Sequence, residues 1–242
     1  MTYRPREFWE QRLSEQFDLR GTGETRMSAA YNDACYALRR EVLTRALADE
    51  RVDVRGRTVL DVGCGTGFWT EYYTSRGAVY TGVDIAETSV RRLRERHPQA
   101  TFLHADVGEA DVPGSFDVVN VFDVLYHVTD DARFDAALGR LALAVKPGGL
   151  LLVTDVFADA PGLAEHNKMR SLGRYRAVLD ARAPFEVAPL RPTHVLLNTH
   201  LGFWRFLNRA PGLLLALDRV LLASGGGDDD RHNKLMVARR MR

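Results

Sequence analysis

Three glycines, Gly63, Gly65 and Gly67, alternate with other residues directly after an apolar stretch and directly before a helical one. Glycine lets a turn adopt left-handed backbone angles and approach a ligand closely, and the helix that follows offers unpaired N–H groups. The pattern therefore predicts a turn that binds a nucleotide-like ligand. The dinucleotide fingerprint of nicotinamide-dependent oxidoreductases requires a glycine where this chain has Phe68, and it does not require Asp61. An oxidoreductase is therefore the weaker interpretation.

Two acids close the next two predicted strands. Asp84 follows Gly67 by seventeen residues, at the place where a Rossmann-like fold positions the carboxylate that accepts hydrogen bonds from ribose hydroxyls. A lone aspartate at a strand end also serves as a helix cap, so this interpretation depends on its pairing with the glycines. Asp106 ends the following strand in the same way.

Over residues 59–155, this arrangement resembles the D-x-G-x-G-x-G signature of the class I, Rossmann-like family of S-adenosylmethionine-dependent methyltransferases, small-molecule type. The resemblance implies S-adenosylmethionine as the cofactor. It implies that the glycine turn contacts the methionine part, that Asp84 binds the ribose and that Asp106 accepts from the adenine amino group. Methionine carries an ammonium, which gives the acid Asp61 an electrostatic role. The resemblance assigns cofactor binding to Asp61, Gly63, Cys64, Gly65, Gly67, Asp84, Ile85, Asp106, Val107, Phe122, Asp123, Trp9 and Tyr31.

Two of these residues, Trp9 and Tyr31, belong to the N-terminal helices, which lie over the cofactor in similar methyltransferases. Packing of the first two helices on the sheet explains both aromatic residues equally well. The sequence leaves the two interpretations open.

Histidines are the candidates for a catalytic base. Methyl transfer to a hydroxyl requires removal of a proton, and a histidine that is neutral near pH 7 suits that task. His127 follows a predicted strand at the edge of the sheet where ligands of α/β folds collect, although it could instead fix its loop by a hydrogen bond. His166 is the rival base or a substrate contact. His194, His200 and Asp155 are further candidates on the substrate side.

These residues predict methyl transfer to a small-molecule acceptor, with O-methylation of a natural-product-like or sugar-bearing metabolite as the leading hypothesis. N-methylation of a small amine is the first alternative, and a protein that binds the cofactor without methyl transfer is the second. The Asn/Asp-Pro-Pro-Tyr/Phe pattern of amide- and adenine-N-methylating enzymes is absent after the fourth strand. No ligand spacing indicates a metal site, and methyl transfer does not require one.

Alternating strands and helices must position these residues. Strands are predicted at 58–62, 79–83, 101–104, 116–122, 150–155, 185–197 and 234–239, and residues 146–149 are predicted as a turn. Helices are predicted at 7–47 with a break at two glycines, 68–76, 88–96, 131–144, 172–180 and 203–222 with a break at Pro211. This order predicts an α/β fold, a three-layer Rossmann-like parallel sheet with an antiparallel last strand, an N-terminal helical cap and an insertion before the last strand.

The 242 residues predict one domain, with a helical cap over 1–50, a cofactor-binding core over 55–155 and substrate-side elements over 156–242. A net charge of +1 does not favour nucleic acid or a membrane surface as a partner. Two cysteines in unlike settings and a charged N-terminus without a signal-like apolar run predict a cytoplasmic protein. The aromatic and leucine-rich stretch at 203–217 suggests an apolar acceptor or a homodimer contact.

Overall fold

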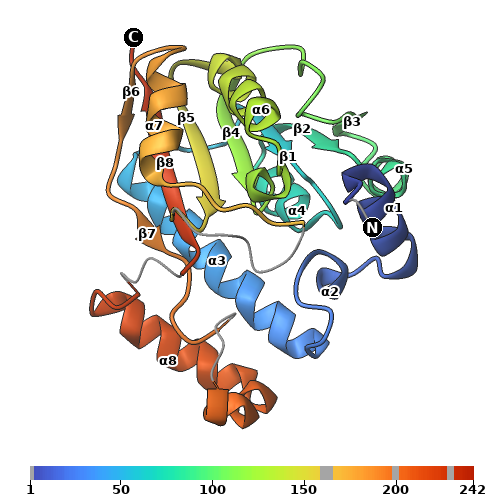
Figure 1. Cartoon of the computed structure of the whole chain (residues 1–242), viewed down its shortest axis with the longest axis vertical. Helices are drawn as coiled ribbons and strands as arrows, with labels where there is room; N and C mark the ends of the chain where they lie inside the picture. Colours follow the sequence, from blue (N-terminus) through green and yellow to red (C-terminus); the bar gives the residue numbers. More distant parts are fainter. Residues whose placement is uncertain (1–2, 159–165, 198–201, 228–231) are drawn as a thin grey trace.

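A mixed sheet of eight strands forms the centre of the computed structural model, which describes residues 3–158, 166–197, 202–227 and 232–242 (Figure 1). The strand order is β3-β2-β1-β4-β5-β8-β6, and β7 pairs with β8. The first five strands run parallel, whereas β8 runs antiparallel to β5, β6 and β7. The strands are β1 Thr58–Val62, β2 Val79–Asp84, β3 Thr101–His104, β4 Phe116–Phe122, β5 Val145–Asp155, β6 Phe185–Val187, β7 Arg191–Pro192 and β8 Lys234–Arg240.

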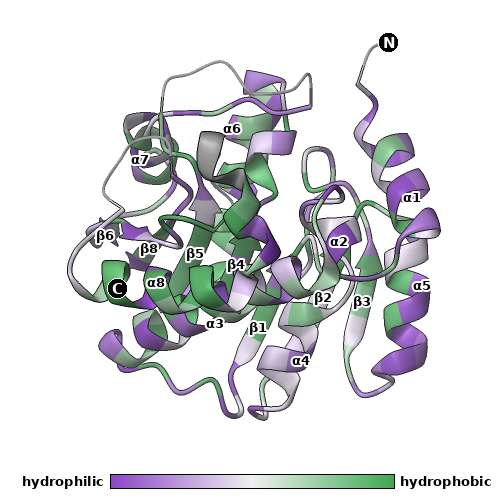
Figure 2. Cartoon of the chain, turned by 90° about the horizontal axis from the view of Figure 1, so that it is seen from below, coloured by the Kyte–Doolittle hydropathy of each residue, from purple (hydrophilic) through white to green (hydrophobic). Residues whose placement is uncertain are grey.

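Helices cover both faces of the sheet, which confirms the predicted three-layer Rossmann-like fold. Residues 150–153 of β5 show why: Leu151 and Val153 pack on one side and Leu150 and Leu152 on the other, so this part of the strand is apolar on both faces. In Figure 2 the central strands are green and the outer side of α5 is purple. The covering helices are α3 Ala29–Asp49, α4 Phe68–Thr74 and α5 Glu87–Arg96 on one face, and α6 Asp131–Ala144 and α7 Leu172–Asp180 on the other.

The N-terminal helices α1, Pro5–Glu15, and α2, Leu19–Thr22, lie beside the carboxyl ends of the first strands (Figure 1). Glu10 attaches α1 to the first turn of α5, because its carboxylate accepts from the Thr88 amide at 3.1 Å and from the Thr88 hydroxyl at 2.5 Å. Arg12 connects α1 to the α2 turn by donating to two backbone carbonyls at 2.6 Å each. These contacts fix the position of the cap over one edge of the sheet.

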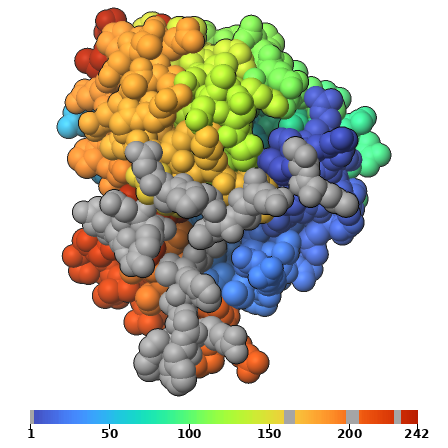
Figure 3. Space-filling model, in the orientation of Figure 1, coloured from blue at the N-terminus to red at the C-terminus, as the bar shows by residue number. Residues whose placement is uncertain are grey.

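The segment before β8 forms the 3₁₀ helix η2, Gly202–Arg209, and the helix α8, Pro211–Ala223. It begins a new helix at Pro211, as predicted, since proline is favoured at the first helical position. Figure 3 shows this segment, in orange to red, at the lower end of the molecule. Asp218 is fully buried on α8, and its carboxylate accepts from the amides of Val195, Leu196 and Leu197 at 2.7–3.2 Å.

Two sequence predictions about strands need correction. The region predicted as one strand at 185–197 forms only the short strands β6 and β7, because Pro189 and Pro192 lack the N–H that a longer ladder would need. The turn predicted at 146–149 instead belongs to β5, which begins at Val145 and shifts register against β4 near Phe116.

We predict that Asp218→Ala lowers the free energy of unfolding by about 2–4 kcal/mol, because three amides, that of Leu197 buried and those of Val195 and Leu196 partly buried, lose their acceptor. Urea unfolding measures the loss, and hydrogen exchange should accelerate first at residues 195–197. Arg219→Ala is the matched control on the same helix. It removes an exposed ion pair with Glu41, which is worth at most about 1 kcal/mol. Equal losses in the two variants would contradict the prediction.

Candidate functional site

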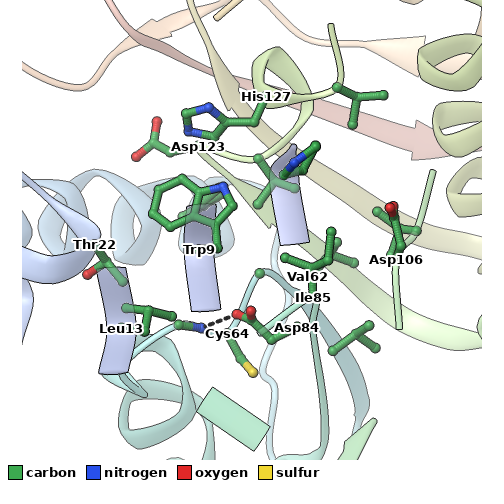
Figure 4. A pocket seen from close by; sticks show the side chains of 18 of the residues that line it. Trp9, Leu13, Thr22, Val62, Cys64, Asp84, Ile85, Asp106, Asp123 and His127 are labelled. Atoms are coloured by element: carbon green, nitrogen blue, oxygen red, sulfur yellow. Dashed lines mark hydrogen bonds between the residues drawn. The ribbon is translucent and has the colours of Figure 1, made fainter. Parts of the chain in front are cut away.

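One cavity opens at the carboxyl ends of β1, β2 and β4, beneath α1 (Figure 4). Its empty space is about 1250 Å³, including space open to solvent. Figure 4 shows Trp9 of α1 between His127 on one side and the loop of Asp84 and Cys64 on the other. Trp9 lines the cavity, and its contact with the cofactor stays a prediction.

The glycine turn, residues 63–67, forms the floor of this cavity. Gly63 and Gly65 have positive φ angles of 75° and 51°, and both line the cavity together with Cys64. A Cβ atom on Gly63 would lie 2.4 Å from Cγ2 of Val124, and one on Gly65 would lie 2.7 Å from Cγ2 of Thr22. Backbone angle and space therefore both require glycine at these two positions.

Asp84 holds the glycine turn in place and also reaches the cavity. Its Oδ2 accepts from the Gly65 amide and its Oδ1 from the Ala86 amide, each at 2.8 Å. Ser89 adds a second attachment by donating to the Gly65 carbonyl at 2.6 Å. Burial raises the pKa of the Asp84 carboxyl, although both amide bonds favour its ionised form. Each carboxyl oxygen keeps a lone pair that a hydroxyl could use.

The next strand end contributes a second acid. Asp106 accepts from the Gly108 amide at 2.7 Å and from Nη2 of Arg133 at 2.8 Å. Asp106 and Arg133 line the cavity, and so do the predicted residues Ile85 and Val107. Sequence reasoning missed Arg133, which reaches this place from the first turn of α6.

Asp61, expected near the ligand, is fully buried outside the cavity lining. Side chains of a strand alternate between its faces. Val62 therefore lines the cavity, whereas Asp61 accepts from the Tyr80 hydroxyl at 2.6 Å and from Nδ2 of Asn120 at 2.7 Å. Burial raises the pKa of Asp61 to about 7. Asp61 therefore belongs to a buried network beneath the turn, and its electrostatic role toward the cofactor stays a prediction.

Gly67 and Tyr31 also lie outside the lining. Gly67 begins α4 with a φ of 93°, and a Cβ there would lie 2.6 Å from Leu93, so its requirement is packing of the helix. Tyr31 is buried near the start of α3 in a cluster with Leu38 and Leu214. For Tyr31, the packing interpretation is the one that the structure favours.

The cap instead contributes two residues that the sequence did not single out. Thr22 and Tyr36 line the cavity, and the Tyr36 hydroxyl donates to the Thr22 hydroxyl at 2.8 Å. The only signal for Thr22 was its place between two glycines, which sequence analysis treated as a helix break. Its functional position depends on the way that α2 folds back onto the glycine turn.

His127 ends the 3₁₀ helix η1, Leu125–His127, and lines the cavity. Its Nδ1 lies 3.0 Å from the backbone carbonyl of His166. A carbonyl can only accept, so Nδ1 carries the proton and Nε2 carries the lone pair. Burial lowers the pKa of His127 to about 4, which keeps the ring neutral at pH 7.

The rival base, His166, lies behind His127 outside the lining. The two imidazole rings stack at 5.5 Å, and the His166 ring also stacks on Phe8 at 5.0 Å. Trp9 meets the His127 ring edge-on at 4.9 Å. This aromatic cluster joins α1 to the loops after β4 and β5 and separates His166 from the cavity.

Asp123 and Phe122 line the cavity at the end of β4. Asp123 has an unusual φ of 59°, and its carboxylate accepts from Arg39 at 2.6 Å and from Nδ2 of Asn233 at 2.7 Å. The Thr154 hydroxyl donates to it at 3.2 Å. Because its carboxylate is already held by three partners, Asp123 is suited to orientation.

Two of the remaining candidates, Asp155 and His194, do not line the cavity. Asp155 is buried and accepts from the Tyr175 hydroxyl, and burial raises its pKa to about 8. His194 is buried beside Thr193, and burial lowers its pKa to about 3. His200 falls outside the described residues.

Neither a metal-binding cluster nor a membrane-spanning helix is found among the described residues. Among the residues with described positions, no three histidine, cysteine, aspartate or glutamate side chains gather in a way that could hold a metal ion. In the same ranges, every helix is too short or too polar to cross a membrane.

Known proteins resemble this chain over the stretch that forms the glycine turn and the strand ends. A family model described as a methyltransferase domain matches residues 59–149. A ubiquinone biosynthesis O-methyltransferase from Pseudomonas paraeruginosa is 39% identical over 114 residues, which are 45% of this chain and 48% of that enzyme. The chain therefore spans about half the length of the curated relatives that it matches.

Solved structures share the fold over a longer range. Magnesium protoporphyrin IX methyltransferase from Synechocystis, with bound S-adenosylmethionine, matches with a TM-score of 0.62 and 18% identity over 97% of this chain and 94% of that chain. The N-methyltransferase NodS from Bradyrhizobium japonicum matches with a TM-score of 0.57 and 16% identity over 85% of this chain and 98% of that chain. Residues 59–149 therefore resemble a methyltransferase domain, and the fold of the chain is the one that Rossmann-like S-adenosylmethionine-dependent methyltransferases share.

Proposed function

We propose that this protein transfers a methyl group from S-adenosylmethionine to a hydroxyl group of a small molecule, a natural-product-like or sugar-bearing metabolite. The observation that carries the proposal is the presence of a neutral histidine, His127, in the same cavity as the glycine turn and Asp84. A small molecule suits the cavity because it is enclosed by α1 and lined largely by apolar and aromatic side chains.

The donor half of the cavity fits the cofactor. The glycine turn leaves no room for side chains, so its backbone is free to meet the methionine part directly. Asp84 would accept from the ribose hydroxyls, and Ile85 and Val107 would enclose the adenine beside Asp106. S-adenosylmethionine, when bound, supplies a methyl group on a sulfonium, which is a strong electrophile.

The acceptor half needs a group that takes a proton. His127 offers Nε2 as that group, since Nδ1 is engaged with the His166 carbonyl. As the acceptor hydroxyl gives its proton to Nε2, its oxygen bonds to the methyl carbon, the carbon–sulfur bond breaks, and S-adenosylhomocysteine is left. Asp123 would hold the acceptor hydroxyl or the loop in line, because its own charge is already balanced by Arg39.

The deciding experiment incubates the protein with S-adenosylmethionine and separate panels of phenols, sugar hydroxyls and small amines. Mass spectrometry then detects a gain of one methylene on any acceptor, together with S-adenosylhomocysteine. A gain on hydroxyl compounds supports the proposal, and a gain only on amines replaces it with N-methylation. Tight S-adenosylhomocysteine binding without any methylated product would indicate a protein that uses the pocket for another purpose.

The first prediction that follows from this proposal concerns the glycine turn. Gly63→Ala should weaken S-adenosylhomocysteine binding at least about tenfold, because the new methyl group clashes with Val124 and strains a left-handed residue. Isothermal titration calorimetry measures the affinity. Gly56→Ala is the control, since Gly56 has a similar φ of 68° with nothing within 4 Å of its Cβ position. Equal affinity in the two variants would argue against binding at this turn.

The second prediction tests His127. His127→Asn should lower turnover at least about a hundredfold while S-adenosylhomocysteine affinity stays unchanged. Asparagine can still donate to the His166 carbonyl, so the loop keeps its attachment while the base is lost. His127→Ala removes both the attachment of the loop and the base. A fully active asparagine variant would show that His127 only fixes the loop.

The third prediction concerns pH. A base must be neutral, and burial lowers the pKa of His127 from 6.5 to about 4. The value of kcat/KM should therefore stay level as pH falls to about 5 and should decline only near pH 4. The same shift makes stability depend on His127: its contribution is present above pH 6.5 and is lost as pH falls toward 4. An activity decline centred at pH 6.5 would mean that the ring is not buried in the working enzyme.

A further inference from the structure

The loop that carries His127 is held by a second segment, residues 166–170, which we call the clasp. The backbone amide of Lys168 donates to the Tyr126 carbonyl at 2.8 Å, and the His166 carbonyl accepts from Nδ1 of His127 at 3.0 Å. Two consecutive residues of the loop are thus bonded to the clasp. The direction of the His127 ring depends on where the clasp places the His166 carbonyl.

Arg170 ends the clasp and bonds back to the same loop. Its Nη2 donates to the Val128 carbonyl at 2.8 Å and to the Thr129 carbonyl at 3.4 Å. Its Nε donates to Asp131 at 3.1 Å, and its Nη1 to the Lys168 carbonyl at 3.2 Å. One guanidinium therefore joins the end of the loop, the start of α6 and the clasp itself.

The surroundings of Arg170 make this arrangement rigid. Its side chain is only 5% exposed, and its guanidinium lies 4.0 Å from the centre of the Phe134 ring. The planar guanidinium stacks on the aromatic ring and donates to several carbonyls at once. The ammonium of a lysine cannot reproduce that geometry. Arg170 does not line the cavity, so an effect of this residue on the reaction would act through other residues.

We propose that Arg170 is a positioning residue for His127: it fixes the clasp against the loop so that the His166 carbonyl holds the proton on Nδ1 and leaves Nε2 free as the base. The catalytic part of this proposal, that Nε2 acts as the base, rests on the function proposed above. Its structural statement, that Arg170 sets the tautomer of His127, is independent of that function.

A purely stabilising arginine would behave differently. Loss of buried hydrogen bonds alone would lower the unfolding temperature and leave the His127 tautomer unchanged. Loss of positioning would let the His166 carbonyl move, and a neutral imidazole in an apolar cluster would then populate both tautomers. The tautomer is therefore the measurement that separates the two roles.

The test uses Arg170→Gln and Arg170→Lys, with Lys168→Gln as the matched control. Lys168 shares Asp131 with Arg170 through an ion pair at 2.9 Å, but its side chain makes no contact with the carbonyls of the loop. Long-range ¹H–¹⁵N NMR of ¹⁵N-histidine-labelled protein reports which ring nitrogen of His127 carries the proton, with His127→Asn used to assign the signal.

The expected result for Arg170→Gln is a mixture of tautomers, a fall in kcat of about tenfold and S-adenosylhomocysteine affinity within twofold of the original. Arg170→Lys should lie between this variant and the original protein, and Lys168→Gln should match the original in all three measurements. If the glutamine variant does not fold, the lysine variant decides. A single Nδ1–H tautomer retained in a folded Arg170 variant would overturn the proposal, and so would an Nε2–H tautomer in the original protein. If the original protein transfers no methyl group, the NMR result still tests the positioning role while the proposed function fails.

Discussion

The structure depends on a steric constraint at the glycine turn. Gly63 and Gly65 have positive φ angles, and side chains from two other segments, Val124 after β4 and Thr22 of α2, fill the space where their Cβ atoms would be. Three segments that are distant in sequence can meet only because these two residues lack side chains. Asp84 completes the arrangement by accepting from the Gly65 amide. The lack of side chains at Gly63 and Gly65 therefore determines how the glycine turn, α2 and the segment after β4 pack around the cavity.

The charge distribution around the cavity explains why a neutral histidine is stable there. His127 is surrounded by rings, and Asp123, an acid in the same lining, is paired with Arg39. Burial opposes a protonated imidazole most strongly and His166 and Arg12 add to that effect, whereas the His166 carbonyl and Asp123 offset only part of it. Protonation would thus place an unpaired charge among apolar groups, which is costly. The same burial that lowers the pKa leaves a carbonyl as the partner of Nδ1, so the environment selects both the charge state and the tautomer.

Much of this fold could be predicted from sequence, and the failures have physical causes. The elements Thr58–Val62, Phe116–Phe122 and Asp131–Ala144 have the predicted bounds, because apolar runs and periodic patterns define buried elements locally. The buried partners of Asp61 were not predicted, because strand alternation turns its side chain away from the cavity that Val62 meets. Thr22, Tyr36 and Arg133 were missed for a different reason. Their positions come from packing between distant segments, and no local pattern records that packing.

This difference separates the two halves of the site. On the proposed function, the donor half would consist of the glycine turn and the ends of β2 and β3, which lie within the stretch 59–149 that the family model matches. The acceptor half would draw on α1 and the loop after β4, with the clasp supporting that loop, and α1 and the clasp lie outside that stretch. Elements outside the sheet can change without disturbing the strand ends. A conserved donor geometry is therefore compatible with unlike acceptors, as the differing names of the matched ubiquinone, protoporphyrin and NodS methyltransferases illustrate. On the function proposed above, acceptor choice in this chain would depend on α1, whose Trp9 lines the cavity beside His127.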